Sequence, residues 1–349
     1  MPSKGLSLIV GGGLAGNLMA WELHSRGHAF EMWSDGTPAA SSVAAGMFNP
    51  VSFRRILPQW NARLFQAEAR NVFQRIEKEL DCSLWHDVPI LRVFPDQAYA
   101  KLWSERAEPG AHEVSEFIEC VAACDVPKGV KAPHGMGRVP EAGWVDVEAF
   151  VQKSIDAWNQ MGLWRDQSWS LQDGCPIGFE NVIDCRGVGA TEDLAQFGLE
   201  LRKNHGEVIR VAPDCDWGNE TVNNVTWALP LSDGSYRVGS TYRWDVHEPM
   251  CLSETPSMLI EGVSQVRERA GNVELLEHKA GLRPSCFDRR PILGIVSDRY
   301  PFYHVCNGWG TRGVSIGPAM VRWVADMIWE GKTTPESVAP ERFRTFTKN

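Results

Sequence analysis

Residues 6–16, which read LSLIVGGGLAG, decide how this chain folds. An apolar run is followed at once by glycines in G-x-G-x-x-G spacing, and residues 17–26 then carry apolar side chains that can share one helical face. This order predicts a strand, a tight turn and a helix. Gly11 permits the turn, Gly13 lets the backbone approach a pyrophosphate, and Gly16 lets the helix pack closely on the strand. Because a helix N-terminus offers free N–H groups to phosphates, the stretch indicates dinucleotide binding; the alternative is a glycine turn that packs a helix without a ligand.

The residue that would contact the cofactor ribose is less clear. A second strand is expected over residues 29–33, and an acidic residue at its end would bind the ribose hydroxyl. Ser34 occupies that place by spacing and Asp35 follows it, whereas Glu31 lies inside the strand. Either Asp35 reaches the ribose or Ser34 forms a weaker bond. No arginine follows directly, so nothing indicates a 2′-phosphate.

Composition excludes several classes of function. The chain has 349 residues, 43% of them hydrophobic, and a formal charge of −9. This suits one large or two interleaved domains. Without a lysine- or arginine-rich block, a surface for nucleic acid or for an anionic membrane is not expected. No apolar run is long enough to span a bilayer, and the residues before the first strand leave no room for a signal peptide, so a cytoplasmic location is expected.

The cysteines do not suggest a metal site. Nine are scattered singly, and Cys120 and Cys124 lie four apart without a further ligand pair. Reduced thiols and no bound metal are therefore expected.

Small residues crowd together in residues 41–50, SSVAAGMFNP. Such a segment suits backbone that lies against a flat group, although an ordinary loop explains it equally well. A strand over residues 181–185 ends in the small residues 186–190, a second place where the chain can pass close to a nucleotide. Residues 126–143, rich in proline and glycine, are expected to be a loop. Helices are expected over residues 60–80, 97–106, 147–161, 257–269 and 318–329.

The pattern changes after residue 206 and returns near the end. Short β-like runs separated by turn residues predict an antiparallel meander. A strand over residues 303–306, the glycine-rich residues 307–314 and a helix then repeat the opening order. We therefore expect an α/β fold with a discontinuous, Rossmann-like nucleotide domain and a substrate domain built on a mixed or antiparallel sheet. The predicted ranges are residues 1–60, 144–205 and 279–349 for the first domain, and residues 61–143 and 206–278 for the second.

Five motifs in this order resemble the D-amino-acid oxidase superfamily, most closely its glycine oxidase branch. They are Ile9 to Gly16; Ala44-Ala45-Gly46-Met47 with Pro50; Gly281-Leu282-Arg283-Pro284 with Asp288; Pro291-Ile292-Leu293-Gly294; and the final glycine-rich turn with Pro318-Ala319. Each motif after the first is moderately specific for the family by itself. Their occurrence in this order across nearly the whole chain is much more specific.

The resemblance implies an extended, non-covalent FAD. Cys286 and Cys306 do not match the position at which some family members attach the flavin. Backbone N–H groups of residues 308–314 would stabilise the negative charge of the reduced flavin. The residues expected to contact FAD are Gly11, Gly13, Leu14, Ala15, Gly16, Ser34, Asp35, Ser41, Ser42, Ala45, Gly46, Met47, Gly187, Gly308, Trp309, Gly310, Thr311, Arg312, Gly313 and Val314.

The resemblance also assigns the substrate carboxylate to Arg283 as a bidentate pair. The alternative is a structural arginine in a buried ion pair, for example with Asp288. Arg312 sits differently from an arginine of glycine oxidases and is a second candidate facing the flavin or the ligand. Tyr242 is a candidate lining residue of the cavity. Arg54 and Arg55 with Trp60 form either an added anion-binding wall or a solvated surface.

The implied reaction oxidises the C–N bond of a small amine or amino acid. The α-hydrogen passes as hydride to flavin N5, the imine hydrolyses, and O₂ takes the electrons and gives hydrogen peroxide, while the enzyme supplies position and desolvation. Three other hypotheses stay open. They are an FAD-dependent dehydrogenase or tailoring enzyme with another acceptor or a larger amine, a non-catalytic flavoprotein, and an NAD-dependent dehydrogenase, against which the C-terminal glycine turn argues.

Overall fold

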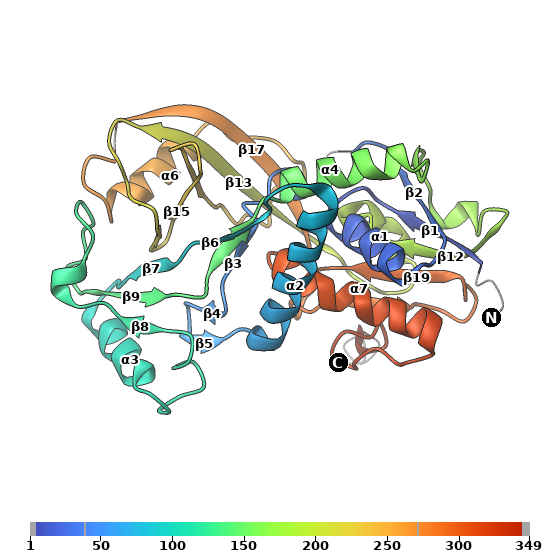
Figure 1. Cartoon of the computed structure of the whole chain (residues 1–349), viewed down its shortest axis with the longest axis horizontal. Coiled ribbons are helices and arrows are strands. Elements are labelled where there is room, and N and C mark those ends of the chain that lie inside the picture. The colour runs from blue at the N-terminus through green and yellow to red at the C-terminus, as the bar shows by residue number, and fades with distance from the viewer. Residues whose placement is uncertain (1–4, 38–39, 271, 344–349) are drawn as a thin grey trace.

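The computed structural model describes residues 5–37, 40–270 and 272–343, which form two main sheets side by side (Figure 1). The expectation that the residues before the first strand leave no room for a signal peptide depends on residues 1–4, which lie outside this part of the chain. The sheet on the right of Figure 1, called sheet 1, has six strands among the described residues. Their order is β11 (Trp164–Asp166), β2 (Phe30–Ser34), β1 (Leu6–Val10), β12 (Phe179–Asp184), β19 (Tyr303–Asn307) and β18 (Ile292–Ile295).

The opening stretch forms the centre of sheet 1. β1 pairs in parallel with β2 on one side and β12 on the other, so that Val10 lies opposite both Trp33 and Asp184. The carboxyl ends of these strands therefore meet at one edge, where open α/β sheets bind ligands. β12 also pairs in parallel with β19, and only β18 of the described strands in this sheet is antiparallel to its neighbour.

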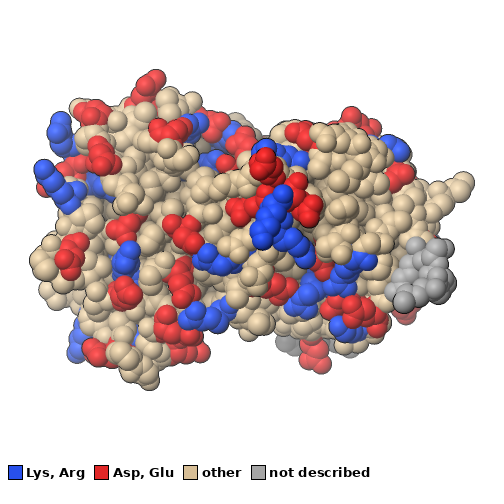
Figure 2. Space-filling model, viewed as in Figure 1, with Lys and Arg blue, Asp and Glu red and all other residues tan. Residues whose placement is uncertain are grey.

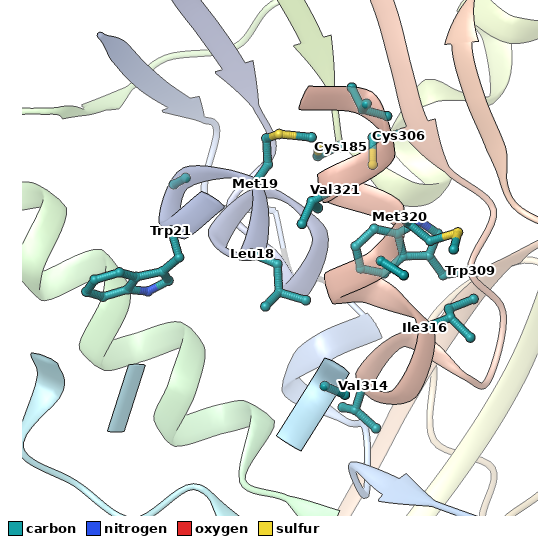
Figure 3. Packing of buried hydrophobic residues seen from close by; sticks show 14 of the residues in the cluster. Leu18, Met19, Trp21, Cys185, Cys306, Trp309, Val314, Ile316, Met320 and Val321 are labelled. Carbon is teal, nitrogen blue, oxygen red and sulfur yellow. The ribbon is translucent and has the colours of Figure 1, made fainter. Parts of the chain in front are cut away.

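Helices pack together over one face of sheet 1, where Ile9, Met32 and Ile183 share a buried cluster with them. α1 (Leu14–Arg26) packs against α7 (Gly313–Glu330) and α4 (Val147–Gln160), and α2 (Ala62–Leu80) lies against α7 between the two sheets (Figure 1). Figure 3 shows Leu18 and Met19 of α1 packed with Val321 of α7 near Cys185 and Cys306. α2 forms because its buried residues recur every three or four positions: Phe65, Ala69, Phe73 and Ile76. A shorter helix, α5 (Thr191–Ala195), follows β12.

The last helix begins earlier than the sequence predicts. α7 starts at Gly313, directly after the glycine-rich turn, and contains Pro318. The predicted start at Pro318 is wrong. Proline is most common in the first helical turn, which favours a start there, but here the surrounding buried residues sustain the helix through Pro318. The earlier start brings the N-terminus of α7 to the glycine turn.

The second main sheet, sheet 2, has eight strands among the described residues and lies on the left of Figure 1. The predicted meander is present, with β14 and β7 as a parallel pair within it. The order is β17 (Val273–Ser285), β13 (Arg202–Pro213), β16 (Tyr236–Gly239), β15 (Trp227–Pro230), β14 (Thr221–Asn223), β7 (Ile90–Val93), β9 (Met136–Val139) and β8 (Glu119–Cys120). Two helices, α6 (Thr255–Ser264) and α3 (Gln97–Ala107), accompany it.

β9 corrects the expectation of a loop over residues 126–143. Met136 and Val139 are buried, and the strand pairs with β7, more than 40 residues earlier in the chain. The short run of residues around Gly137 has too little apolar alternation to predict a strand, and pairing with β7 decides its structure.

Short strands form two small additional sheets. One consists of β3 (Met47–Phe48), β10 (Gly143–Val145) and β6 (Trp85–Asp87), and the other of β4 (Val51–Ser52) and β5 (Leu57–Pro58).

The predicted fold, a parallel Rossmann-like sheet with a separate mixed sheet, is confirmed. The assignment of residue ranges to two domains stays a prediction; β17 runs across its boundary at residue 279. Within the described residues, no helix combines the length and apolar character that crossing a bilayer needs. On the face shown in Figure 2, acidic and basic side chains are interspersed among the described residues.

Candidate functional site

The glycine turn after β1 has the geometry that its sequence predicts. Gly11 has a φ of +107°, which favours glycine, and a Cβ there would lie 2.8 Å from the backbone of Cys185. A Cβ at Gly16 would lie 1.9 Å from the carbonyl oxygen of Gly11, so α1 approaches the turn as closely as the backbones allow. Gly13 is the N-cap residue of α1, and it has no side chain that could accept a hydrogen bond from the first N–H groups of the helix. The N-terminus of α1 therefore presents backbone N–H groups at the carboxyl edge of sheet 1.

The two candidates for the ribose contact lie in different surroundings. The Ser34 hydroxyl lies 3.0 Å from where a Cβ on Gly12 would be, beside the turn. Asp35 is exposed and accepts a hydrogen bond from the Thr37 N–H at 3.0 Å, which holds the pKa of the Asp35 carboxyl below its usual value. The Trp164 ring also comes within 2.5 Å of that same Cβ position. Ser34 is therefore the candidate that lies beside the turn, and the Trp164 ring lies against the same point of the turn, Gly12.

The segment rich in small residues also returns to the glycine turn. The Ser41 hydroxyl accepts a hydrogen bond from the Leu14 N–H at 2.8 Å. Gly46 has a φ of +69°, and a Cβ there would meet the Val145 carbonyl oxygen at 1.9 Å. Ser42 lines a shallow hollow against β13 and β17. The structure thus brings Ser41 to the N-terminus of α1 and packs Gly46 against β10; the contacts of residues 41–47 with FAD stay a prediction.

Two predicted cofactor segments meet the motif around Arg283 at the end of β17. The Asn307 side chain donates to the Gly187 carbonyl oxygen at 2.9 Å, and the Gly310 N–H donates to the Pro284 carbonyl oxygen at 2.8 Å. A Cβ at Gly187 would lie 3.7 Å from the Pro284 ring. The C-terminal glycine turn is therefore tied to the residue that follows Arg283.

The side chains of this C-terminal turn point in different directions. Trp309 is buried in the core around α7 (Figure 3), and its Nε1 has no hydrogen-bond partner among the described residues. Val314 is buried in the same cluster, whereas Thr311 is exposed. A Cβ at Gly313 would lie 2.8 Å from the Leu14 side chain, so the two glycine turns are neighbours. At Trp309 and Val314, the backbone is thus the part available to a cofactor.

Arg283 lies on β17 opposite Asn204 of β13. Its Nη1 donates to Asn204 Oδ1 at 3.0 Å and to the Thr241 carbonyl oxygen at 3.2 Å. Its Cζ lies 4.6 Å from the centroid of the Tyr242 ring. Gly206 makes this arrangement possible, because a Cβ there would fall 2.0 Å from Nη1.

Arg283 has no acidic partner among the described residues. Burial lowers the pKa of its guanidinium, because the charged form loses hydration there. The suggested ion pair with Asp288 is not formed, since Asp288 binds Arg342 at 2.8 Å instead. In the described structure Nη1 alone donates hydrogen bonds, so the Nε–Nη2 edge is available to an anion.

Arg312 joins a second group of arginines. It is partly buried, and burial, together with Arg290 and Arg289, lowers its pKa to about 10. It lines a shallow hollow with Trp60 and Ser315. The cation over the Trp60 ring is Arg290, at 3.9 Å, whereas Arg54 and Arg55 are exposed. The suggested wall of Arg54, Arg55 and Trp60 is therefore not what the structure forms.

Sequence reasoning missed residues that are recognisable only once the chain is folded. Asn204 and Gly206 lie about 80 residues before Arg283 and reach it through the pairing of β13 with β17. Trp164 reaches the glycine turn from β11. None of the three belongs to a local motif, so no signal in the sequence could have singled them out.

These features fit a dinucleotide. Backbone approaches at Gly11, Gly16 and Gly46 leave no room for side chains, and the α1 N-terminus provides N–H donors. Fold and site together define a dinucleotide-binding α/β protein with a separate, partly buried arginine that has no acidic partner among the described residues. The family model described as FAD dependent oxidoreductase (DAO) matches residues 7–327. The chain belongs to this family of FAD-dependent oxidoreductases, which confirms the predicted resemblance.

Solved structures share the fold at low identity. A glycine oxidase from Bacillus cereus ATCC 14579 is 18% identical with a TM-score of 0.80, covering 95% of this chain and 96% of that one. An iminodiacetate oxidase from Chelativorans sp. BNC1 is 20% identical with a TM-score of 0.78, covering 96% and 98%.

Curated relatives are similarly distant. A D-amino-acid oxidase of Rubrobacter xylanophilus is 26% identical over 332 residues, covering 89% of this chain and 91% of the relative. The tRNA 5-methylaminomethyl-2-thiouridine biosynthesis bifunctional protein MnmC of Legionella pneumophila (strain Corby) is 20% identical over 92% of this chain. The chain spans about half of that relative, 54% of its length.

Proposed function

We propose that this chain oxidises the C–N bond of a small amine or amino acid with non-covalently bound FAD, and that Arg283 holds the substrate carboxylate. The observation that carries the proposal is the Arg283 guanidinium, which is partly buried and has no acidic partner in the described residues. A cation withdrawn from water is unfavourable unless an anion compensates it. A carboxylate on the free Nε–Nη2 edge would form the bidentate pair that arginine favours.

The residues that would hold FAD lie along the edge shared by the glycine turns. The N-terminus of α1 would bind the pyrophosphate, Ser34 or Asp35 the ribose, residues 41–47 the flank of the cofactor, and residues 308–314 its flavin end. When bound, FAD would supply a hydride acceptor: the α-hydrogen and its electron pair would leave the C–H bond of the α-carbon, and the C–N bond would become the imine.

The protein's own residues supply position and desolvation. Arg283 would fix the carboxylate, and thereby the α-carbon, while the Tyr242 ring covers the guanidinium. The reaction requires no protein acid or base once the amine is neutral, and water hydrolyses the imine product. O₂ would take the two electrons and two protons to give hydrogen peroxide.

The cysteines support non-covalent binding. Burial raises the pKa of the Cys286 thiol to about 12, and Cys306 is fully buried. A thiol with so high a pKa forms little of the thiolate that covalent attachment needs. Heat denaturation should therefore release free FAD into the supernatant.

A second candidate keeps FAD and changes the substrate and acceptor. Tyr242, whose ring contacts Arg283, is 59% exposed, so this side of the arginine faces an open surface that suits a larger amine. The similarity to a tRNA-modifying protein points the same way. This candidate is a tailoring enzyme or a dehydrogenase that passes electrons to an acceptor other than O₂.

One experiment tests both candidates. FAD-loaded protein is mixed anaerobically with a panel of amines and amino acids, and flavin bleaching is recorded. Bleaching by a small amino acid, followed by oxygen uptake and peroxide release, supports the first candidate. Bleaching without oxygen uptake, or by larger amines alone, supports the second, and a flavin that none of the panel reduces contradicts both.

A further inference from the structure

A carboxylate is buried beneath the substrate arginine. Glu207 on β13 is fully buried and has no lysine or arginine partner among the described residues. Its oxygens instead accept hydrogen bonds, each 2.8 Å long, from the Leu252 N–H, the Thr255 hydroxyl and His278 Nε2. Burying a carboxylate is unfavourable unless such bonds satisfy it, so this position is strongly constrained.

The same residue is bonded to the segment that contacts Arg283. The Glu207 N–H donates to Thr241 Oγ1 at 2.8 Å, and the Thr241 N–H donates to the Glu207 carbonyl oxygen at 3.3 Å. The Thr241 carbonyl oxygen in turn accepts from Arg283. Two residues further along, Arg243 exchanges two backbone hydrogen bonds of 2.9 Å with His205. Tyr242 therefore lies between two residues that are both bonded to β13. The segment carrying the Tyr242 ring is thus fixed to β13 around Glu207.

The three carboxylate bonds reach two neighbouring segments, the start of α6 and strand β17. Leu252 precedes α6, Thr255 begins α6, and His278 lies on β17, five residues before Arg283. Cys251 lies close by, with its Sγ within 4.8 Å of the ligand atoms of Glu207 and His278. Because the carboxylate already accepts three hydrogen bonds, the protein itself accounts for the cluster without a metal.

We propose that Glu207 is a positioning residue for the substrate arginine. It fixes β13, β17 and residues 241–243 relative to one another, so that Arg283 keeps its Nη1 bonds and leaves its Nε–Nη2 edge open to the carboxylate. The inference rests on the proposed function, because it presumes that Arg283 binds the substrate carboxylate. Glu207 itself touches neither substrate nor cofactor.

The test measures the binding of acetate to the FAD-loaded full chain by ligand-observed NMR. Glu207→Gln removes the charge and one acceptor, and Thr241→Val removes the hydroxyl that accepts from Glu207. Both should weaken acetate binding at least tenfold. Thr241→Ser keeps the acceptor and should stay within twofold of the wild type. Glu220→Gln, which breaks a more exposed ion pair with Arg138 in the same sheet, is the matched control and should bind as the wild type does.

The outcomes separate this inference from the proposed function. If Glu207→Gln and Thr241→Val melt at lower temperature but bind acetate normally, Glu207 is only structural and the inference is overturned. If Glu207→Gln does not fold, Thr241→Val decides the question, with Thr241→Ser as its rescue. If Arg283→Ala binds acetate as tightly as the wild type does, the carboxylate role of Arg283 fails and the inference fails with it.

Discussion

The guanidinium of Arg283 lies over the ring of Tyr242, with Cζ 4.6 Å from the ring centroid. The two residues come from β17 and from the segment after β16, and β13 holds both. The face of an aromatic ring attracts a cation, and the ring also limits the directions in which the guanidinium can move. Tyr242 therefore stabilises the arginine in the orientation that the Asn204 and Thr241 bonds select.

Replacing Tyr242 should reveal this contact. A half-exposed cation–π pair is worth about 0.5–1 kcal/mol, so Tyr242→Leu should lower kcat/KM for a carboxylate substrate about two- to fivefold. Tyr242→Phe keeps the ring and should behave nearly as the wild type does. A large loss in the phenylalanine variant would instead assign a role to the hydroxyl group. Steady-state kinetics on the best substrate found by flavin bleaching decides between these results.

Removing the arginine should have a larger and more selective effect. A hydrogen bond to a charged group contributes about 1.5–3 kcal/mol, so Arg283→Ala should raise KM for a carboxylate substrate roughly ten- to 150-fold. FAD content should be unchanged, because the cofactor residues lie elsewhere. The control is the matching amine without its carboxylate, for which wild type and variant should differ little. Equal losses for both substrates would show that Arg283 is structural.

Gly206 tests the packing beneath the arginine. In Gly206→Ala the new Cβ would fall 2.0 Å from Nη1 and 2.2 Å from Cζ of Arg283, so the guanidinium must move. We expect a lower melting temperature and at least tenfold weaker binding of a carboxylate substrate. Shortening the arginine removes the clash, so Gly206→Ala/Arg283→Ala should melt above Gly206→Ala alone. If the double variant melts no higher, the strain lies in the backbone and not in this contact.

Local sequence was enough to predict the nucleotide half of the site. Strand, glycines and helix follow one another within residues 6–26, and the steric demands of the turn act between near neighbours in the chain. The spacing could not decide between Ser34 and Asp35, because their positions relative to the turn depend on how β2 pairs with β1 and β11. Trp164, which brings a ring over the turn, belongs to that neighbouring strand.

The surroundings of Arg283 could not be predicted in the same way. The motif around Arg283 identified the arginine itself, whereas Asn204, Gly206 and Glu207 enter through a strand pairing that joins residues about 80 positions apart. Similarly, Arg54 and Arg55 are close to Trp60 in sequence, but Arg290 is the cation that stacks on it. Tertiary packing determines which side chains satisfy a buried charge. The periodicity of apolar residues along the sequence does not predict it.

His304 should make the stability of the protein depend on pH. It is buried on β19, its Nε2 bonds to Asn181 Oδ1 at 3.0 Å, and its Nδ1 has no partner in the described residues. Burial lowers its pKa from 6.5 to about 4. Between these values the unfolded chain binds the additional proton and the folded chain does not, so stability is present above pH 6.5 and is lost as the pH falls toward 4. From pH 7 to pH 5 the free energy of unfolding should fall by about 2 kcal/mol through this residue.

Urea unfolding at the two pH values measures this loss, with His304→Leu as the matched variant. The leucine side chain cannot titrate, so its unfolding free energy should change less between pH 7 and pH 5 by about the amount assigned to His304. Other histidines and carboxylates titrate in both proteins and cancel in the comparison. Equal losses in wild type and variant would show that His304 accepts its proton in the folded state near its ordinary pKa. In that case the buried Nδ1 must have a partner, such as an internal water molecule, that offsets the cost of charging the ring.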